Sequence, residues 1–229
     1  MKIALLGYGR MGQAIEQIAI DRGHTIIAKI DKDNPNEAYE ADVAINFSVP
    51  MAAYDNITGA IHKKIPVICG TTGWLDRLDE VETLCKQNEG AFLYASNFSL
   101  GVNLFFELNA KLAEMMQKHP LYTASIEEIH HTQKLDKPSG TAITLAEGIP
   151  SEGKAWHLVE DQAEGVPITS IRKDDVPGTH SVTHRSEIDE ISITHTAHNR
   201  TGFALGAVLA AEWIQDKKGI FSMRDVLQI

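Results

Sequence analysis

The feature that most constrains the fold is a G-x-G-x-x-G motif near the N-terminus. It follows an apolar run that begins at Ile3, and apolar residues then recur at helical spacing, so the motif joins a strand to a helix. Its residues are Gly7, Tyr8, Gly9, Arg10, Met11 and Gly12. Glycines at these positions let the backbone approach a pyrophosphate, and the helix N-terminus favours its negative charge. The motif therefore predicts a dinucleotide site, with a purely structural strand–helix turn as the alternative.

Asp31 supports a dinucleotide site. It lies about 20 residues after the motif, directly after the strand-like run 25–30, where an acidic side chain can accept hydrogen bonds from ribose hydroxyls. Its carboxylate would repel a 2′-phosphate, whereas Lys32 and Arg10 would attract one. These residues leave both NADH and NADPH open as the cofactor.

Strand-like and helical patterns alternate through the first part of the chain. Polar helical stretches separate apolar runs at 3–6, 25–30, 43–47, 67–69 and 91–95. This alternation predicts a parallel sheet with crossover helices. The run Gly70-Thr71-Thr72 follows one of these strands, at an edge where such a sheet binds ligands.

The pattern changes near Gly101. A long amphipathic segment leads to strand-like runs at 124–129, 168–172, 180–183 and 188–196, and a helical pattern returns at 203–214. The turn residues from Asp174 to Gly178 are typical of a hairpin. We predict an α/β chain in two domains. A Rossmann-type dinucleotide-binding domain spans 1–101 and is completed by 200–229, and an α+β domain with a mostly antiparallel or mixed sheet spans 102–199.

Composition narrows the possible functions. The 229 residues carry 31 Asp and Glu against 21 Lys and Arg, a formal charge of −10 that opposes binding to nucleic acid or anionic lipid. Cys69 and Cys85 form no Cys-x-x-Cys motif, which is typical of packing roles in a reducing compartment. No apolar run is long enough for a membrane span. We expect a cytoplasmic protein that acts on a small molecule, without nucleic-acid or membrane partners.

A second polar motif occupies residues 130–142, directly after a strand-like run. His130 and His131 offer two imidazoles for proton transfer, and Lys134 follows in the expected loop. The run Ser139-Gly140-Thr141 precedes a helical pattern whose first N–H groups are free to bind a carboxylate. These residues predict an anion-binding site for proton transfer, with a structural histidine pair beside a capped helix as the alternative.

The histidines do not favour a metal site. His180 and His184 are four residues apart, but on a strand this spacing separates them by roughly 13 Å, too far for one zinc ion. The sequence contains no His-Glu-x-x-His or Cys-x-x-Cys motif. We therefore predict that the protein binds no metal.

Taken together, the motifs resemble those of the dihydrodipicolinate reductase family, also called 4-hydroxy-tetrahydrodipicolinate reductases. The resemblance runs nearly end to end and includes Glu128-Ile129-His130-His131, Lys134, Asp136, Pro138 to Ala142 and the glycine motif. It implies an NAD(P)H-dependent reductase that converts a cyclic unsaturated dicarboxylate to tetrahydrodipicolinate in diaminopimelate and lysine biosynthesis. It also implies a homotetramer formed by the sheets of the second domain.

The resemblance implies roles for particular residues. His130 would be the acid/base residue and Lys134 the proton donor, while the substrate's carboxylates would be held by His131, Ser139, Gly140, Thr141 and Arg200. The residues expected at the cofactor are Gly7, Tyr8, Gly9, Arg10, Met11, Gly12, Asp31, Lys32, Gly70, Thr71, Thr72, Ala95, Ser96, Asn97 and Phe98. Two other functions fit the motifs: an NAD(P)-dependent oxidoreductase for another imine or amino acid, and a dinucleotide-binding protein without turnover.

Overall fold

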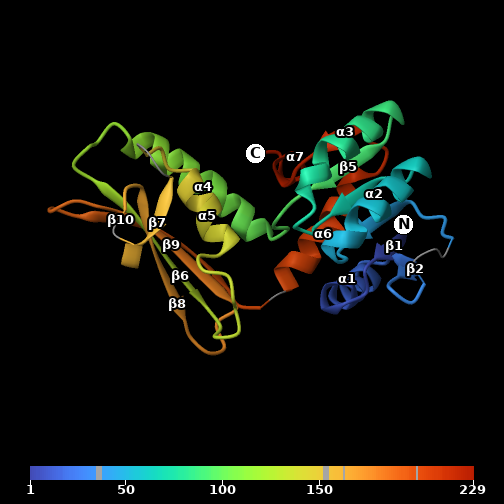
Figure 1. Cartoon of the computed structure of the whole chain (residues 1–229), viewed down its shortest axis with the longest axis horizontal. Coiled ribbons are helices and arrows are strands. Elements are labelled where there is room, and N and C mark those ends of the chain that lie inside the picture. Colours follow the sequence, from blue (N-terminus) through green and yellow to red (C-terminus); the bar gives the residue numbers. More distant parts are fainter. Residues whose placement is uncertain (35–37, 152–154, 162, 200) are drawn as a thin grey trace. The chain divides into compact units, whose positions relative to one another are not determined.

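The computed structural model of the chain describes residues 1–34, 38–151, 155–161, 163–199 and 201–229 (Figure 1). Its internal contacts divide it into two units, and each is described by itself. Unit 1 comprises Met1–Leu100 and Thr201–Ile229, and unit 2 comprises Gly101–Arg200. Within the described ranges, no helix is long and apolar enough to cross a membrane.

Unit 1 is built on a six-stranded sheet in the order β11-β5-β4-β3-β1-β2, and every adjacent pair is parallel. Its strands are β1 (Lys2–Leu6), β2 (Thr25–Ile30), β3 (Val43–Asn46), β4 (Val67–Cys69), β5 (Ala91–Tyr94) and β11 (Gly219–Phe221). Its helices are α1 (Arg10–Asp21), α2 (Pro50–His62), α3 (Leu78–Gln87), α6 (Thr201–Ile214) and α7 (Met223–Leu227), with a 3₁₀ turn at Leu75–Arg77. The predicted Rossmann-type sheet is confirmed.

Helices cover both faces of this sheet, which explains why its central strands β3, β4 and β5 are buried and apolar along nearly their whole length. Helices α1 and α6 pack on one face of the sheet, and α2 and α3 pack on the other (Figure 1). Ile3 and Leu5 of β1 point to the first face, and Ala4 and Leu6 point to the second. The predicted helix at 203–214 is confirmed as part of α6, which lies in the core of this unit. The short strand β11 and helix α7 were not predicted, because so few residues carry little periodicity.

Unit 2 is a five-stranded mixed sheet in the order β10-β9-β6-β8-β7. Its strands are β6 (Thr123–His130), β7 (Trp156–Leu158), β8 (Val166–Arg172), β9 (Gly178–Arg185) and β10 (Glu190–Ala197). Its helices are α4 (Leu100–Met116), which begins at the last residue of unit 1, and α5 (Gly140–Glu147), with a 3₁₀ turn at Val159–Asp161. Both helices pack on one face of the sheet through Phe105, Leu145, Ile126 and Val182. The prediction of a mixed sheet is confirmed.

The predicted hairpin around Asp174 to Gly178 is wrong. β6 lies between β8 and β9, pairing parallel with β8 and antiparallel with β9. Turn residues specify that the chain reverses direction, but they do not specify which strand it pairs with afterwards. The connection passes the end of β6, where the backbone N–H of Lys173 donates to the carbonyl oxygen of His130 at 2.8 Å. It therefore brings the start of β9 to the predicted catalytic residues.

Candidate active site

A cavity of about 400 Å³ lies at the carboxyl ends of the strands of unit 1. Five residues of the predicted cofactor set line it: Gly7, Tyr8, Gly9, Asp31 and Lys32. Six further residues that the sequence did not single out complete the wall: Ile30, Phe47, Ser48, Val49, Ala52 and Asn56. This is the edge at which open α/β sheets bind their ligands.

The backbone at this cavity requires glycine. Gly7 has a φ of +102°, and a Cβ built on it would lie 2.2 Å from the carbonyl oxygen of Phe47. A Cβ on Gly12 would lie 2.5 Å from the carbonyl oxygen of Gly7. Side chains at either position would displace backbone, because no flexible group is available to move. The cradle that results fits the pyrophosphate of a dinucleotide.

Tyr8 is fixed in the cavity wall by two side chains. Its hydroxyl contacts the carboxylate of Glu16 on α1, and the ammonium of Lys29 on β2 donates to that hydroxyl at 3.2 Å. Lys29 also lies 2.6 Å from Glu16, and these contacts lower the pKa of Glu16 below its usual value. Of the residues that line the cavity, Asp31 and Lys32 are the charged ones that a ligand would meet.

The loop that follows β4 is tied to the cavity through Thr71. The hydroxyl of Thr71 accepts from the backbone N–H of Ser48 at 2.9 Å, and its carbonyl oxygen accepts from the indole of Trp74 at 2.7 Å. A Cβ on Gly70 would lie 2.2 Å from the ring of Phe47. The next residue after Thr71, Thr72, has an exposed side chain. The loop therefore stands beside the residues that line the cavity.

The segment after β5 also reaches this edge of the sheet. The backbone N–H of Ala95 donates to the carbonyl oxygen of Cys69 at the end of β4, at 3.2 Å. Ser96 is exposed and Asn97 half-buried, whereas Phe98 is buried in the core shared with α6. The Phe98 ring packs in this core, and its contact with the cofactor stays a prediction. Arg10 is exposed and Met11 is half-buried at the start of α1.

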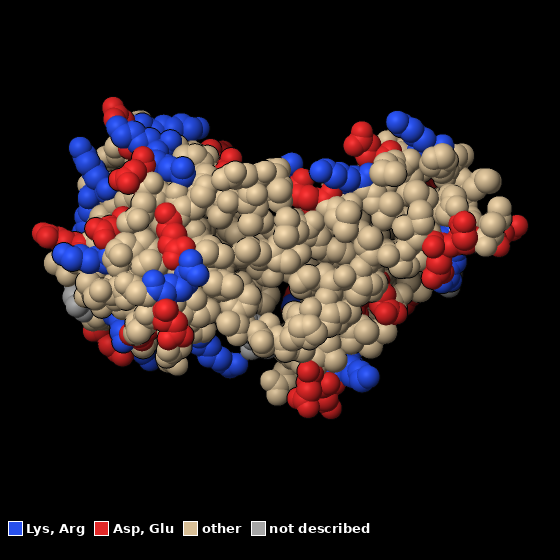
Figure 2. Space-filling model, turned by 180° about the vertical axis from the view of Figure 1, so that it is seen from behind, with Lys and Arg blue, Asp and Glu red and all other residues tan. Residues whose placement is uncertain are grey.

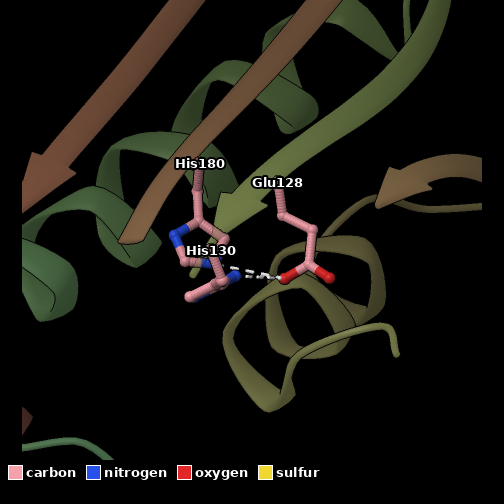
Figure 3. A group of neighbouring side chains, drawn as sticks. All are labelled: Glu128, His130 and His180. Carbon is pink, nitrogen blue, oxygen red and sulfur yellow. Dashed lines mark ion pairs between the residues drawn. The ribbon is translucent and has the colours of Figure 1, made fainter. Parts of the chain in front are cut away.

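The second group of predicted residues is assembled in unit 2 around the end of β6. His130 is the last residue of this strand, so the histidine pair lies at a strand terminus as expected. Side chains alternate along a strand, and Ile126, Glu128 and His130 therefore share the face covered by α5. Nδ1 of His130 lies 3.0 Å from Oε2 of Glu128 (Figure 3).

Glu128 is a buried carboxylate with a counter-ion. Its relative exposure is 0%, and Oε1 lies 3.1 Å from Nη2 of Arg172, which ends the neighbouring strand β8. The backbone N–H of Ser139 donates to the same oxygen at 3.1 Å. Burial alone would raise the pKa of Glu128, but its contacts with His130, Ser139 and Ser170 outweigh burial and hold the pKa far below its usual value. Glu128 is therefore ionised.

Ser139 and His180 continue this network to the start of α5. The Ser139 hydroxyl accepts from the backbone N–H of Ala142 at 3.2 Å, which makes Ser139 the N-cap of the helix. The same hydroxyl lies 3.1 Å from Nε2 of His180 on β9. Burial, followed by the proximity of His130, lowers the pKa of His180 to about 3, so this imidazole is neutral near pH 7.

Lys134 lies in the loop between β6 and α5. Its ammonium is 2.8 Å from Oδ2 of Asp136, and this contact lowers the pKa of Asp136 despite the opposing effect of burial. His131 and Thr141 are half-buried, and Gly140 is exposed at the first residue of α5. The predicted substrate residue Arg200 lies outside the described residues.

The same cluster could in principle bind a metal ion. It contains one potential ligand atom from each of Glu128, His130 and His180, and these three atoms lie within 4.8 Å of one another. Two cationic or partly positive groups already face the carboxylate: Arg172 and the N-terminal end of α5, where Ser139 donates its N–H. A divalent cation would have to compete with both. The chemistry of the cluster thus favours a proton-transfer network, and the absence of a bound metal stays a prediction.

Stability should fall as the pH drops below about 6.5. Burial lowers the pKa values of His180, His184 and His195. The unfolded chain takes up protons at these histidines near pH 6.5, whereas the folded protein resists uptake, so the unfolded state binds more protons. The free energy of unfolding therefore decreases from pH 6.5 toward pH 3. Urea unfolding at pH 7.5 and 5.0 measures this change, and equal free energies would contradict it.

The fold and these residues together are those of an NAD(P)-dependent oxidoreductase: a Rossmann-type unit with a glycine cradle, and a unit with a buried network of a carboxylate and two histidines. The sequence model described as dihydrodipicolinate reductase, N-terminus, matches residues 1–98, and the model described as dihydrodipicolinate reductase, C-terminus, matches residues 101–227. The chain therefore belongs to the dihydrodipicolinate reductase family.

Similar proteins agree with this assignment. A protein of Christiangramia forsetii named 4-hydroxy-tetrahydrodipicolinate reductase is 58% identical, covering 99% of this chain and 98% of its own. A protein of the same name from Bdellovibrio bacteriovorus is 38% identical over 99% of this chain and 96% of its own. A solved structure of dipicolinate-bound dihydrodipicolinate reductase from Paenisporosarcina sp. TG-14 shares the fold, with a TM-score of 0.77, 22% identity and 97% coverage of both chains.

Four residues of the unit 2 network were absent from the predicted site: Glu128, Arg172, Gly178 and His180. The alternation Ile126, Glu128, His130 along one strand could have placed Glu128 beside His130. No comparable signal exists for the other three, because they reach His130 and Glu128 only through the pairing of β8 and β9 with β6.

Proposed function

We propose that this protein catalyses the NAD(P)H-dependent reduction of the cyclic dicarboxylate 4-hydroxy-tetrahydrodipicolinate to tetrahydrodipicolinate, in diaminopimelate and lysine biosynthesis. The observation that carries the proposal is the end-to-end 58% identity with a relative of that name. The alternative of a dinucleotide-binding protein without turnover leaves the buried network of unit 2 unexplained.

Each predicted group suits a dianionic substrate that accepts a hydride. A bound reduced nicotinamide would supply that hydride, the chain would supply a proton, and the 4-hydroxyl group would leave as water. Lys134 is the proposed proton donor and His130 the proposed acid/base residue. His131, Arg200 and the start of α5 at Ser139-Gly140-Thr141 are proposed to hold the carboxylates, since free N–H groups and cations stabilise anions.

The direct test is loss of absorbance at 340 nm when the purified protein receives the freshly made product of the preceding synthase. The assay should be run in parallel with NADH and NADPH. Oxidation of either cofactor that depends on the synthase product supports the proposal. No loss with either cofactor would overturn it and favour a different imine or amino-acid substrate.

Asp31 is proposed to disfavour a 2′-phosphate on the cofactor. Its carboxylate lines the cavity and accepts from the backbone N–H of Lys32 at 2.8 Å, which fixes its direction. Asp31→Ala is expected to raise the ratio of kcat/KM for NADPH over NADH by about tenfold, since it removes the repulsion but leaves Lys32. Asp33 is exposed and does not line the cavity, so Asp33→Ala is the matched control. An equal change in both variants would contradict this role.

We also propose a cytoplasmic homotetramer without nucleic-acid or membrane partners. The proposed contact between subunits is formed by the sheet of unit 2. In this sheet, hydroxyl pairs join the edge strand β10 to β9, with Ser181 to Thr194 at 2.9 Å and Thr183 to Ser192 at 2.8 Å. Lys and Arg side chains lie among Asp and Glu side chains on the face drawn in Figure 2. The chain as a whole has a formal charge of −10, which opposes binding to nucleic acid or anionic lipid. Light scattering that gives the mass of a single chain would contradict the tetramer.

A further inference from the structure

The carboxylate of Glu128 connects the two halves of the proposed catalytic motif. One oxygen, Oε2, lies 3.0 Å from Nδ1 of His130, the proposed acid/base residue. The other, Oε1, accepts from the backbone N–H of Ser139, the N-cap of α5, at 3.1 Å. Arg172 lies 3.1 Å from this second oxygen and compensates the charge. One buried side chain therefore contacts both the proposed proton-transfer residue and the proposed carboxylate-binding helix end.

The contact with His130 determines which ring nitrogen carries the proton. An ionised carboxylate offers only lone pairs, and an unprotonated Nδ1 would face it with another lone pair at 3.0 Å. The charge of the carboxylate therefore favours a proton on Nδ1, although the two atoms form a close ion pair and not an aligned hydrogen bond (Figure 3). In the neutral ring this leaves Nε2 as the nitrogen that can accept or pass on a proton.

The opposite side of the ring is accommodated by Gly178, the first residue of β9. A Cβ on Gly178 would lie 3.1 Å from Nε2 and 3.3 Å from Cδ2 of His130, which is closer than ordinary contact. The imidazole is thus held between a carboxylate on its own strand and a glycine on the neighbouring one. Its orientation is set from both sides.

We propose that Glu128 is a positioning residue that fixes the Nδ1–H tautomer of His130 and, through the Ser139 N–H, aligns the start of α5 with it. The inference rests on the proposed function, because His130 and α5 are assigned there to proton transfer and carboxylate binding. Glu128 acts on the substrate through these two groups and not by contact of its own.

Replacement of Glu128 by glutamine makes a specific prediction. The Ser139 N–H and Arg172 are both donors, so the amide oxygen has to face them. The amide NH₂ then faces Nδ1 of His130, and a donor at that position requires Nδ1 to be unprotonated. Glu128→Gln should therefore transfer the proton of His130 from Nδ1 to Nε2.

Nuclear magnetic resonance can test this on the full chain. Histidine labelled with ¹⁵N reports at pH 8 whether Nδ1 of each ring carries a proton, and a His130→Asn variant assigns the signals of His130. We expect a protonated Nδ1 in the unaltered protein and an unprotonated one in Glu128→Gln. An unprotonated Nδ1 in the unaltered protein would overturn the proposal, even if the variant failed to fold.

Glu127→Gln is the matched control. Glu127 precedes Glu128 on β6, but its side chain is exposed on the other face of the sheet. This variant should leave the tautomer and the kinetics unchanged. The same shift of the proton in both variants would contradict a specific role for Glu128.

Kinetics provide the second readout. Glu128→Gln keeps an oxygen that accepts from the Ser139 N–H, so it should lower kcat about tenfold and leave KM for the dicarboxylate within about twofold. Glu128→Ala removes that oxygen as well and should also raise KM about tenfold, whereas partial unfolding alone would lower the apparent kcat and leave KM unchanged. Glu128→Asp keeps the charge and should recover part of both losses. An unchanged KM in Glu128→Ala would overturn the link to α5. A protein that reduces no dicarboxylate would refute the proposed function, while the tautomer measurement would still decide the role of Glu128.

Discussion

Lys134→Ala is expected to give a folded protein that binds NADH but turns over at least about a hundredfold more slowly, the usual scale for a lost proton donor. The fold should survive because the backbone of Lys134 makes the structural contacts in this loop. Its N–H donates to the carbonyl oxygen of His131 at 3.1 Å, and its own carbonyl oxygen accepts from Arg172 at 3.4 Å. The side chain contributes an ion pair with the exposed Asp136, which adds little stability.

Lys137 provides the control for this prediction. It lies three residues further along the same loop, and its ammonium is 2.7 Å from Glu160 at the surface. Lys137→Ala removes the same charge from the same loop and should leave kcat within about twofold of the unaltered value. Unchanged turnover in Lys134→Ala, or an equal loss in both variants, would remove Lys134 from the mechanism.

Gly206→Ala is expected to destabilise unit 1 by about 3 kcal/mol, with a fall in Tm of roughly 6–12 °C. Gly206 lies in α6, and a Cβ at this position would be 1.7 Å from the carbonyl oxygen of Phe98. Backbone would have to move, since no side chain there can rotate away. The displaced segment is the one that contains Ala95 to Phe98, so NADH binding should weaken as well. Thermal unfolding followed by circular dichroism measures the first effect, and fluorescence titration the second.

Gly59 is the matched control, because it is also a helical glycine of unit 1. Apart from its chain neighbours and its own helix backbone, no atom of the described residues lies within 4 Å of a Cβ built on it. Gly59→Ala should therefore leave the protein unchanged or stabilise it by about 0.5–1 kcal/mol, through the higher helix propensity of alanine. If both variants lost the same stability, the close approach of α6 to Phe98 would not be the cause.

Much of unit 1 could be predicted because its signals are local. The motif from Gly7 to Gly12 and the acidic residue Asp31 define a strand, a turn and a helix through neighbouring residues. Continuous apolar runs also identified five of the six strands, since strands of a parallel sheet are buried on both faces. The strand that was missed, β11, has three residues and takes its place only by pairing with β5.

Unit 2 was less accessible to prediction, because its arrangement depends on distant pairing. The turn residues near Asp174 were identified correctly as a turn, yet the hairpin they suggested does not form. β9 is held beside β6 by the packing of side chains such as Val182 under α4 and α5. Such contacts join residues that are far apart in the sequence, so local sequence patterns do not predict them.

The sequence by itself determined the dinucleotide-binding fold, the position of His130 at a strand end and the start of α5 after Ser139, because each depends on residues close together in the chain. Tertiary structure alone decided that Arg172, Gly178 and His180 meet Glu128 and His130. Burial, a lowered pKa and a fixed imidazole orientation are properties of groups brought together by strand pairing and removed from water. They exist only once the sheet has formed.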